Sequence, residues 1–242
     1  MFQVRLPQWA KPQSMKKKNG HYLALPRHGL VYARIPKAAN SSIKHTMHDF
    51  LFEPQENTNR KVNQDRYWAE HESGLADLVD IRGLQKKYSD FFVFTFVRNP
   101  FCRIASCYFD KIARREHRSK PSKFKGKGFR EGMSFRDFVV HISGIKDKNA
   151  NVHFRAQSSM LLHRGSNICD FVGRVENMDA DWATLQKLVL TKLGHTLPDV
   201  RKVHQSKSRP KTAEMYDAEL IRLVRERYAS DFELFYPDLM AP

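Results

Sequence analysis

The segment Phe91-Phe-Val-Phe-Thr-Phe-Val97 is an apolar run broken by a single threonine. Such a run is typical of a strand that is buried on both faces, as in a parallel sheet covered by helices. It stops at Arg98-Asn99-Pro100, where a proline at the first helical position can open a helix that contains Ile104 and Tyr108. The pattern therefore predicts a buried strand, a short polar loop and a helix, in that order.

A second unit of the same kind lies upstream. The segment Leu30-Val-Tyr-Ala-Arg-Ile35 is rich in strand-forming residues and ends at Pro36. Ser41 or Ser42 then has the chemistry of a helix N-cap, and apolar residues recur at helical spacing as far as Leu51. Two such units favour an α/β fold with a central, mainly parallel sheet flanked by helices.

The 242 residues suit one domain, which we expect to span residues 28–242. Residues 1–27 are rich in Pro, Lys and Gln without periodicity, so we expect an N-terminal extension there. Apolar periodicity predicts further helices around residues 75–84, 135–142, 182–193 and 212–228, and a short strand within 168–175.

The chain carries 42 Lys and Arg against 26 Asp and Glu, a formal net charge of +16. Since 41% of the residues are hydrophobic, a chain that never collapses is excluded. The charge favours an anionic partner, which could be nucleic acid, a membrane surface, a phosphorylated cofactor or an acidic polymer. Residues 114–130 hold eight basic residues and one acid, and we expect a mobile basic loop there.

The cysteines Cys102, Cys107 and Cys169 do not have the spacing of a zinc site, so we expect no metal. Their odd number also favours a reducing compartment. The N-terminus lacks the apolar run of a signal peptide, and no stretch approaches the ~20 apolar residues of a membrane span. We therefore expect a cytoplasmic protein.

The loop Pro36-Lys-Ala-Ala-Asn-Ser-Ser-Ile-Lys44 joins a strand to a helix, which is the usual ligand position in an open parallel sheet. Backbone N–H groups at the helix start, two hydroxyl groups and Lys37 can together hold a phosphate or sulfate. The glycines of a Walker A loop are absent. On this segment alone, an ordinary capped helix with a solvated lysine is an equally good interpretation.

The second loop repeats this arrangement. Arg98 leaves the end of the buried strand, and Ser106 lies two turns into the following helix, so both could face one oxyanion. A guanidinium group offers bidentate hydrogen bonds to phosphate. Arg98 could equally be one partner of a structural ion pair.

Taken together, P-K-A-A-N-S-S-I-K followed by F-V-R-N-P-F-x-R-x-x-S-x-Y resembles the two nucleotide-binding signatures of the sulfotransferases that use 3′-phosphoadenosine 5′-phosphosulfate (PAPS). The match is most similar to the carbohydrate sulfotransferases, including the HNK-1/chondroitin group and heparan sulfate 2-O-sulfotransferase. Weaker matches follow at Asn151-Val-His-Phe154, at Cys169–Glu176 and from Ser206 to Phe235. The resemblance implies a P-loop-NTPase-like sulfotransferase fold.

The resemblance also implies roles by position. It assigns the 5′-phosphosulfate loop to Lys37, Ala38, Ala39, Asn40, Ser41 and Ser42, and the 3′-phosphate site to Arg98 and Ser106. Sulfuryl transfer leaves negative charge on the oxygen that bridges to the departing phosphate. A cation at that point stabilises the transition state more than the ground state, and Lys37 is the residue we expect there. No metal ion is then required.

The acceptor hydroxyl group needs a base, for which the sequence leaves three choices. His71, in Glu70-His-Glu72, lies where heparan sulfate 2-O-sulfotransferase carries its proposed catalytic histidine. His153 lies in an N-x-H-F element that resembles the N-x-H-W element of the HNK-1 group. A carboxylate such as Glu70 or Glu72 is the third choice.

Ser206 and Arg209 form an S-x-x-R element before the last helix, where this fold often closes over the nucleotide; a plain solvated loop is the competing interpretation. Glu176 ends the V-G-R-V-E element and could be structural. We expect no membrane anchor or stem of the kind that the Golgi enzymes have, and Cys169 lacks a neighbouring cysteine. These departures favour a cytoplasmic, bacterial protein.

The resemblance implies a saccharide acceptor, which the basic charge suggests is acidic, and we expect no nucleic acid partner. The 114–130 loop and the N-terminal lysines would line an acidic acceptor groove, with peripheral membrane association if the acceptor is lipid-linked. Two alternatives stay open: a basic nucleic-acid-binding protein, and a P-loop phosphotransferase. The first lacks an RNP-type or helix-turn-helix motif, and the second lacks the P-loop glycines.

Overall fold

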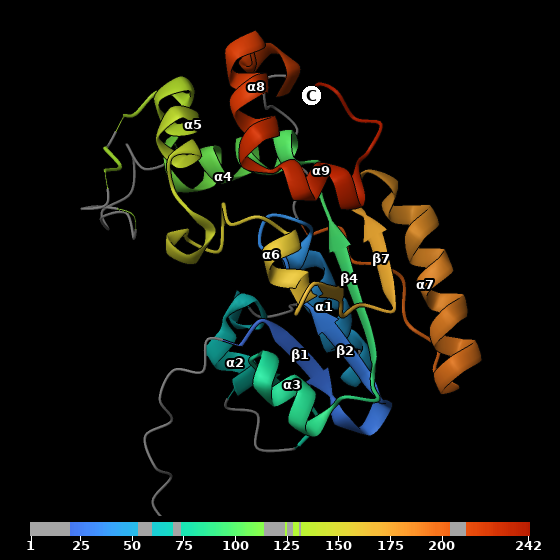
Figure 1. The fold of residues 1–242 in the computed structure, drawn as a ribbon. Coiled ribbons are helices and arrows are strands. Elements are labelled where there is room, and N and C mark those ends of the chain that lie inside the picture. The colour runs from blue at the N-terminus through green and yellow to red at the C-terminus, as the bar shows by residue number, and fades with distance from the viewer. Residues whose placement is uncertain are drawn as a thin grey trace, which may run out of the picture.

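A five-stranded sheet lies at the centre of the protein (Figure 1). The structure is a computed structural model, and it describes residues 20–52, 60–69, 74–113, 124, 128–130, 132–203 and 212–242. The strands in spatial order are β3 (Asp77–Val79), β1 (Tyr22–Leu25), β2 (Leu30–Ala33), β4 (Phe92–Val97) and β7 (Phe171–Arg174). A two-stranded sheet, β5 (Leu162–His163) with β6 (Ser166–Asn167), lies apart from it.

The central sheet is mixed. β2 pairs with β4 and β4 with β7 in parallel, whereas β1 is antiparallel to both β2 and β3. Four of these five strands therefore run in one direction and β1 runs against them. The α/β class expected from the two strand–loop–helix units is confirmed.

Strand β4 is buried on both faces, as its sequence predicts. Phe94 and Phe96 pack into a cluster on one face, while Val93 and Val97 pack into a cluster on the other. Thr95, the polar residue of the run, is fully buried and its hydroxyl group donates a hydrogen bond of 2.7 Å to the carbonyl of Ala33. That bond satisfies the threonine hydroxyl in an apolar setting.

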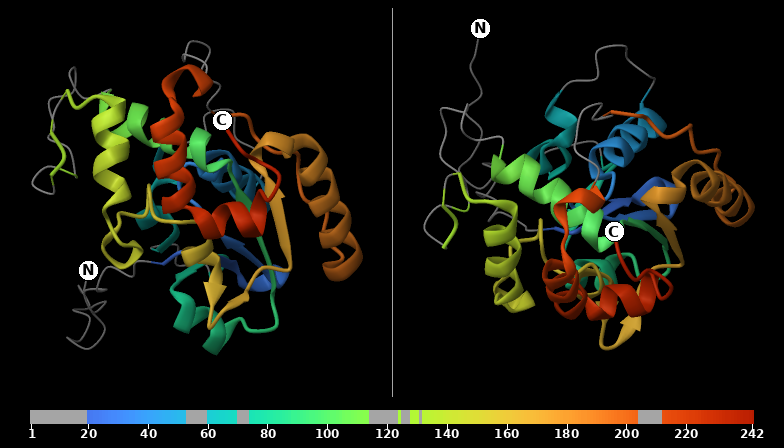
Figure 2. Two further views of the ribbon diagram at one scale, coloured as in Figure 1. Left: turned by 45° about the horizontal axis from the view of Figure 1, so that its top comes forward. Right: turned by 90° about the horizontal axis from the view of Figure 1, so that it is seen from above.

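Helices cover both faces of the sheet. In the part of the chain that the structure describes, the helices are α1 (Asn40–Leu51), α2 (Asp65–Ala69), α3 (Ile81–Lys87), α4 (Pro100–Lys111), α5 (Phe135–Ser143), α6 (Ser158–Leu161), α7 (Met178–Leu193), α8 (Ala218–Arg227) and α9 (Ala229–Phe235). The aromatic face of β4 is covered by α1, α2 and α7, and the opposite face by α3 to α6, α8 and α9. Figure 2 shows α1 and α7 on the side of the strands opposite α8 and α9.

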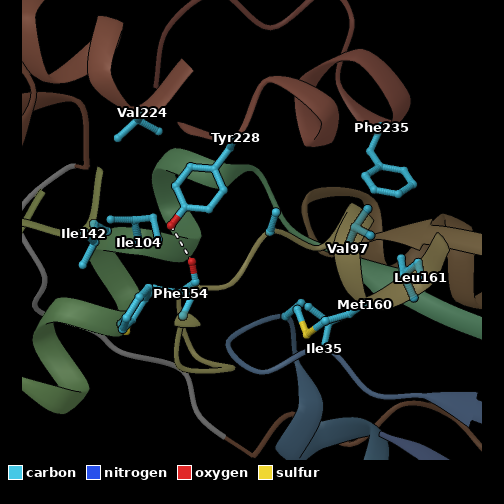
Figure 3. Packing of buried hydrophobic residues seen from close by; sticks show 14 of the residues in the cluster. Ile35, Val97, Ile104, Ile142, Phe154, Met160, Leu161, Val224, Tyr228 and Phe235 are labelled. Carbon is cyan, nitrogen blue, oxygen red and sulfur yellow. Dashed lines mark hydrogen bonds between the residues drawn. The ribbon is translucent and has the colours of Figure 1, made fainter. Parts of the chain in front are cut away.

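The apolar cluster that contains Val93 and Val97 joins the sheet to the C-terminal helices (Figure 3). Ile35 and Val97, each just beyond or at the end of a parallel strand, pack into it with Phe235 of α9. Tyr228, at the junction of α8 and α9, is buried there and donates a hydrogen bond of 2.6 Å to the carbonyl of Phe154. The carboxyl end of the sheet is thus fixed against the last two helices.

The structure corrects three expectations about where elements begin and end. β1 lies inside the stretch that the sequence assigned to an extension, because four apolar residues between Lys-rich sequence and Pro26 are too few to show periodicity. The expected helix over 75–84 is instead β3 followed by α3, whose N-cap is Asp80. The expected single helix over 212–228 is a short 3-10 turn followed by α8, which Asp217 caps, and α9 continues beyond it.

The other predicted elements are confirmed, namely the helices at α4, α5 and α7 and the strand at β7. Most of the basic 114–130 loop and part of 201–211 lie outside the described residues. Within the described part of the chain, no helix is long and apolar enough to cross a membrane.

Gly173 of β7 offers a test of the central packing. A Cβ atom at this position would lie 2.4 Å from the ring of Phe96, whereas a Cβ at Gly144 would meet nothing closer than 3.8 Å. We expect Gly173→Ala to lower the free energy of unfolding by about 1–3 kcal/mol, because the fully buried ring has no room to move. Urea denaturation measures this, with Gly144→Ala as the control; equal stability of the two variants would contradict the packing.

Candidate active site

Two loops meet at the carboxyl end of the parallel strands. One leads from β2 to α1 and contains Lys37; the other leads from β4 to α4 and contains Arg98. Because β2 and β4 are parallel neighbours, these loops lie side by side at one edge of the sheet. The guanidinium of Arg98 donates a hydrogen bond of 3.3 Å to the carbonyl of Lys37, so the two predicted phosphate-binding segments are in direct contact.

The first loop has an unusual backbone. Lys37 and Ala39 have φ angles of 71° and 52°, in the left-handed region that non-glycine residues rarely adopt. Ala39 is the N-cap of α1, and no side chain caps this helix, so the expectation that Ser41 or Ser42 is the N-cap is wrong. The first turn of a helix leaves N–H groups without partners in the helix, and these favour an anion.

Lys37 is largely buried, with its side chain 17% exposed, and its ammonium group lies 3.1 Å from a carboxylate oxygen of Asp110. Burial lowers the pKa of Lys37, while the charge of Asp110 opposes that effect. Burial pushes the pKa of Asp110 upward, but the charge of Lys37 and the hydrogen bond from Lys111, at 2.9 Å, outweigh it and hold that pKa well below its usual range. Asp110 is therefore an ionised carboxylate between two lysines.

Arg103 of α4 ties the first loop to a third segment. The residue is 1% exposed, and its guanidinium donates to three backbone carbonyl groups, those of Pro36, Arg155 and Val152, at 3.0, 2.7 and 3.2 Å. A buried cation with all these bonds made is satisfied by carbonyl dipoles rather than by an acid. The segment 151–155 is thereby held against the Lys37 loop.

The backbone of Arg98 is fixed by Gln157. The side-chain amide of Gln157 accepts from the N–H of Arg98 and donates to its carbonyl, both at 2.9 Å. Gln157 is in turn held by Asp231 of α9, whose carboxylate accepts the backbone N–H groups of Gln157 and Ser158 at 2.9 and 2.7 Å. Gln157 and Asp231 are both fully buried, so this positioning is rigid.

Glu176 supports the second loop from the other side. One of its carboxylate oxygens accepts from the backbone N–H of Asn99 at 2.9 Å, and the other accepts from the hydroxyl group of Tyr236 at 2.8 Å. Glu176 thus has the positioning contacts of a structural residue, which was one of the interpretations of the V-G-R-V-E element.

His153 belongs to the segment that Arg103 holds. Its Nδ1 lies 2.7 Å from the side-chain oxygen of Asn151, which accepts the proton of that nitrogen and leaves Nε2 as an acceptor. Burial, followed by the charges of Lys111 and Lys37, lowers the pKa of His153 to about 3. His153 is therefore neutral near pH 7 and has the tautomer that a general base needs.

The remaining candidates divide into two groups. Ser41 and Ser42 lie in the first turn of α1, where Ser42 accepts a hydrogen bond of 3.4 Å from the N–H of Val203, and Ser106 is buried on α4. The others, His71 with its neighbours Glu70 and Glu72, and Ser206 with Arg209, lie outside the described residues. Of the expected bases, His153 is the one that the structure describes, so its position relative to Lys37 is known.

The structure also adds residues that the sequence did not indicate, chiefly Asp110, Arg103 and Gln157. A helical spacing could have pointed to Asp110, since it follows Ser106 by four residues on α4 and so shares its face. Gln157 gives no such signal. Within the described part of the chain, no group of three His, Cys, Asp or Glu side chains could hold a metal ion.

Comparison with known proteins agrees with this geometry. Residues 20–237 match the Sulfotransferase family. Among relatives, carbohydrate sulfotransferase 8 of Homo sapiens is 24% identical, covering 88% of this chain and 53% of its own length. Carbohydrate sulfotransferase 12 of Xenopus laevis is 25% identical (68% and 47%), and carbohydrate sulfotransferase 14 of Mus musculus is 26% identical (90% and 60%).

The chain belongs to the sulfotransferase family and is distantly related to carbohydrate sulfotransferases. It spans about half the length of most of the relatives that it matches. No solved structure matches it significantly. The family implies PAPS as the sulfuryl donor.

Arg103 allows a test of how the loops are held together. We expect Arg103→Lys to lower the free energy of unfolding by roughly 2–4 kcal/mol, because one ammonium group cannot reach all three carbonyl groups of the buried site. Chemical denaturation measures the loss. Arg222→Lys, at an exposed ion pair with Glu226 on α8, is the matched control and should change stability by less than about 1 kcal/mol. Similar losses for both variants would show that Arg103 is not a structural tie.

Proposed function

We propose that this protein transfers a sulfuryl group from PAPS to a hydroxyl group of a saccharide acceptor, by in-line displacement. The observation that carries the proposal is the direct contact of Arg98 with the Lys37 loop at the carboxyl end of two parallel strands. Family membership and the distant relationship to carbohydrate sulfotransferases support the same chemistry and the same class of acceptor.

The residues at this edge fit an anionic nucleotide. Lys37 and Arg98 supply two cations, and the N-terminus of α1, which no side chain caps, adds backbone N–H groups. We assign the 5′-phosphosulfate end to residues 37–42 and the 3′-phosphate to Arg98 and Ser106. When bound, the donor supplies the sulfuryl group and a phosphate leaving group.

Lys37 is the residue we propose to stabilise the leaving oxygen. The ammonium group of Lys37 donates a hydrogen bond of 3.1 Å to Asp110, whose charge favours the protonated form of the lysine. Because the ammonium group is already held in place, it does not have to be reoriented during the reaction. Because Lys37 is mostly buried, its charge acts through a medium less polar than bulk water and is worth more there.

For the base we propose His153, with His71 as the alternative. In the reaction the acceptor oxygen forms a bond to sulfur as the bond from sulfur to the bridging phosphate oxygen breaks, and Nε2 takes the acceptor proton. Asn151 holds the ring by its Nδ1, which keeps Nε2 free to accept. The electron pair of the broken bond leaves with the phosphate, beside Lys37.

Donor binding tests the first half of the proposal. We expect calorimetry to detect binding of 3′-phosphoadenosine 5′-phosphate, the product nucleotide, to the full chain. Lys37→Ala should weaken that binding at least about tenfold, because a charge-assisted hydrogen bond in a partly buried site is lost. Lys187→Ala, at an exposed lysine of α7, is the control and should bind as the native chain does. A native chain that does not bind the nucleotide would refute the proposal.

The base is tested by paired substitutions. We expect His153→Gln to lower kcat by about 10²–10⁴-fold and His71→Gln to change it by less than tenfold, since only the first removes the proposed proton acceptor. The reverse order would assign the base to His71.

Titration of the His153 ring by NMR gives a second readout of the same site. In the free protein, we expect the ring to stay neutral down to about pH 4, because burial and two lysine charges depress its pKa to about 3. Bound product nucleotide should raise that pKa, since its phosphates offset the charges of Lys37 and Lys111. A midpoint near the ordinary value of 6.5 in the free protein, unmoved by the nucleotide, would contradict this electrostatic account.

A further inference from the structure

A cavity of about 680 Å³ opens beside His153. It lies between the C-terminal end of α5, the segment that follows this helix, and the two residues Phe124 and Phe129. The lining residues are Phe124, Phe129, Gly144, Ile145, Lys146, Asn149, Asn151 and Phe154. Its volume is within the range of about 300–1,000 Å³ that small-molecule sites occupy.

The lining combines an apolar wall with a polar rim. Three phenylalanines form the wall, where the rings of Phe124 and Phe129 have centroids 5.0 Å apart. Exposed Lys146 and Asn149 lie on the rim, and no acidic side chain is among the lining residues described. An aromatic wall accepts the C–H face of a pyranose ring, and amide groups bind its hydroxyl groups.

Two lining residues also contact His153. Asn151 holds the His153 ring at 2.7 Å, and the Phe124 ring lies edge-on to it, with centroids 6.3 Å apart. The neighbouring Phe154 is anchored through its carbonyl by Tyr228, as Figure 3 shows. The cavity and the proposed base therefore share a wall that the C-terminal helices keep in place.

We propose that this cavity is an acceptor subsite that takes one sugar unit bearing a carboxylate or sulfate group, next to the unit whose hydroxyl group reacts. The inference rests on the proposed function and adds the location and charge of the acceptor site. Lys146 pairs with the anionic group, the phenylalanines pack against the ring, and Asn149 and Asn151 bind hydroxyl groups. The surplus of positive charge on the chain attracts such a polymer toward the site.

Sulfate transfer from labelled PAPS to defined glycans tests this. The acidic probes are polygalacturonate, alginate, hyaluronan and chondroitin, and the neutral probes are dextran and amylose. We expect transfer to at least one acidic glycan and a lower KM for it than for either neutral one. With that glycan, Lys146→Glu should raise KM at least about tenfold with kcat within twofold, because the anion meets a like charge. Asn149→Ala should raise KM in the same direction.

The controls separate this inference from the proposed function. Lys187→Glu makes the same charge change on the far helix α7 and should leave KM unchanged. Lys146→Glu should bind 3′-phosphoadenosine 5′-phosphate as the native chain does. If it loses nucleotide binding instead, the cavity belongs to the donor and the inference is overturned. A native chain that binds the nucleotide yet prefers neutral glycans, uses no acidic one, or is insensitive to Lys146→Glu also overturns the inference while leaving donor binding intact.

Discussion

Parallel pairing between β2 and β4 determines where the rest of the candidate site lies. The register that joins Leu30–Tyr32 to Phe92–Phe94 brings the ends of both strands to the same edge, and each strand passes directly into a loop and a helix. Lys37 and Arg98 are 61 residues apart in sequence but hydrogen-bonded in space for this reason. The pairing is possible because β4 is apolar on both faces, so helices can cover it on either side. The function of the loops thus depends on a strand that contains none of the candidate chemical groups.

Buried polar groups then position what the strands bring together. Arg103, Gln157 and Asp231 are almost inaccessible to solvent, and each forms hydrogen bonds with backbone groups. Burying such groups is costly unless their hydrogen bonds are made, so each one specifies a single arrangement of the segments that it joins. Together they connect the Lys37 loop, the Arg98 loop, the segment 151–158 and α9. This explains why the C-terminal helices, which hold no candidate catalytic residue, are part of the site.

The sequence was sufficient for the elements with strong local signals and for the two strand–loop–helix units that contain Lys37 and Arg98. The apolar run of β4, the proline that opens α4 and the periodicity of α5 and α7 depend on neighbouring residues only, so they could be predicted. The N-cap of α1 could not, because Ala39 takes a left-handed conformation that local preferences disfavour and that the surrounding contacts must impose. Gln157 also escaped prediction, since its role exists only through contact with a residue 59 positions away. The spacing from Ser106 places Asp110 on the same face of α4, but it does not reveal the contact with Lys37, 73 positions away. The role of Lys44 could not be predicted either. It is the last residue of the first motif, but it is buried and its ammonium group forms an ion pair of 2.8 Å with Asp65 of α2, which indicates a structural role.

The ion pair between Lys37 and Asp110 explains how a buried cationic site can stay charged and ordered when no anion is bound. A largely buried lysine with no partner would tend to lose its proton, because burial disfavours the charged form. Asp110 opposes this loss by supplying a negative charge, and the charges of Lys37 and Lys111 keep Asp110 ionised in turn. The two lysines and one carboxylate leave a net positive charge, so a phosphate or sulfuryl group is still attracted. Burial, assisted by the same positive charge, keeps His153 neutral in the free protein, as a base must be before it takes a proton. In the free protein, the cations that would bind the donor therefore add to the effect of burial on the protonation state of His153.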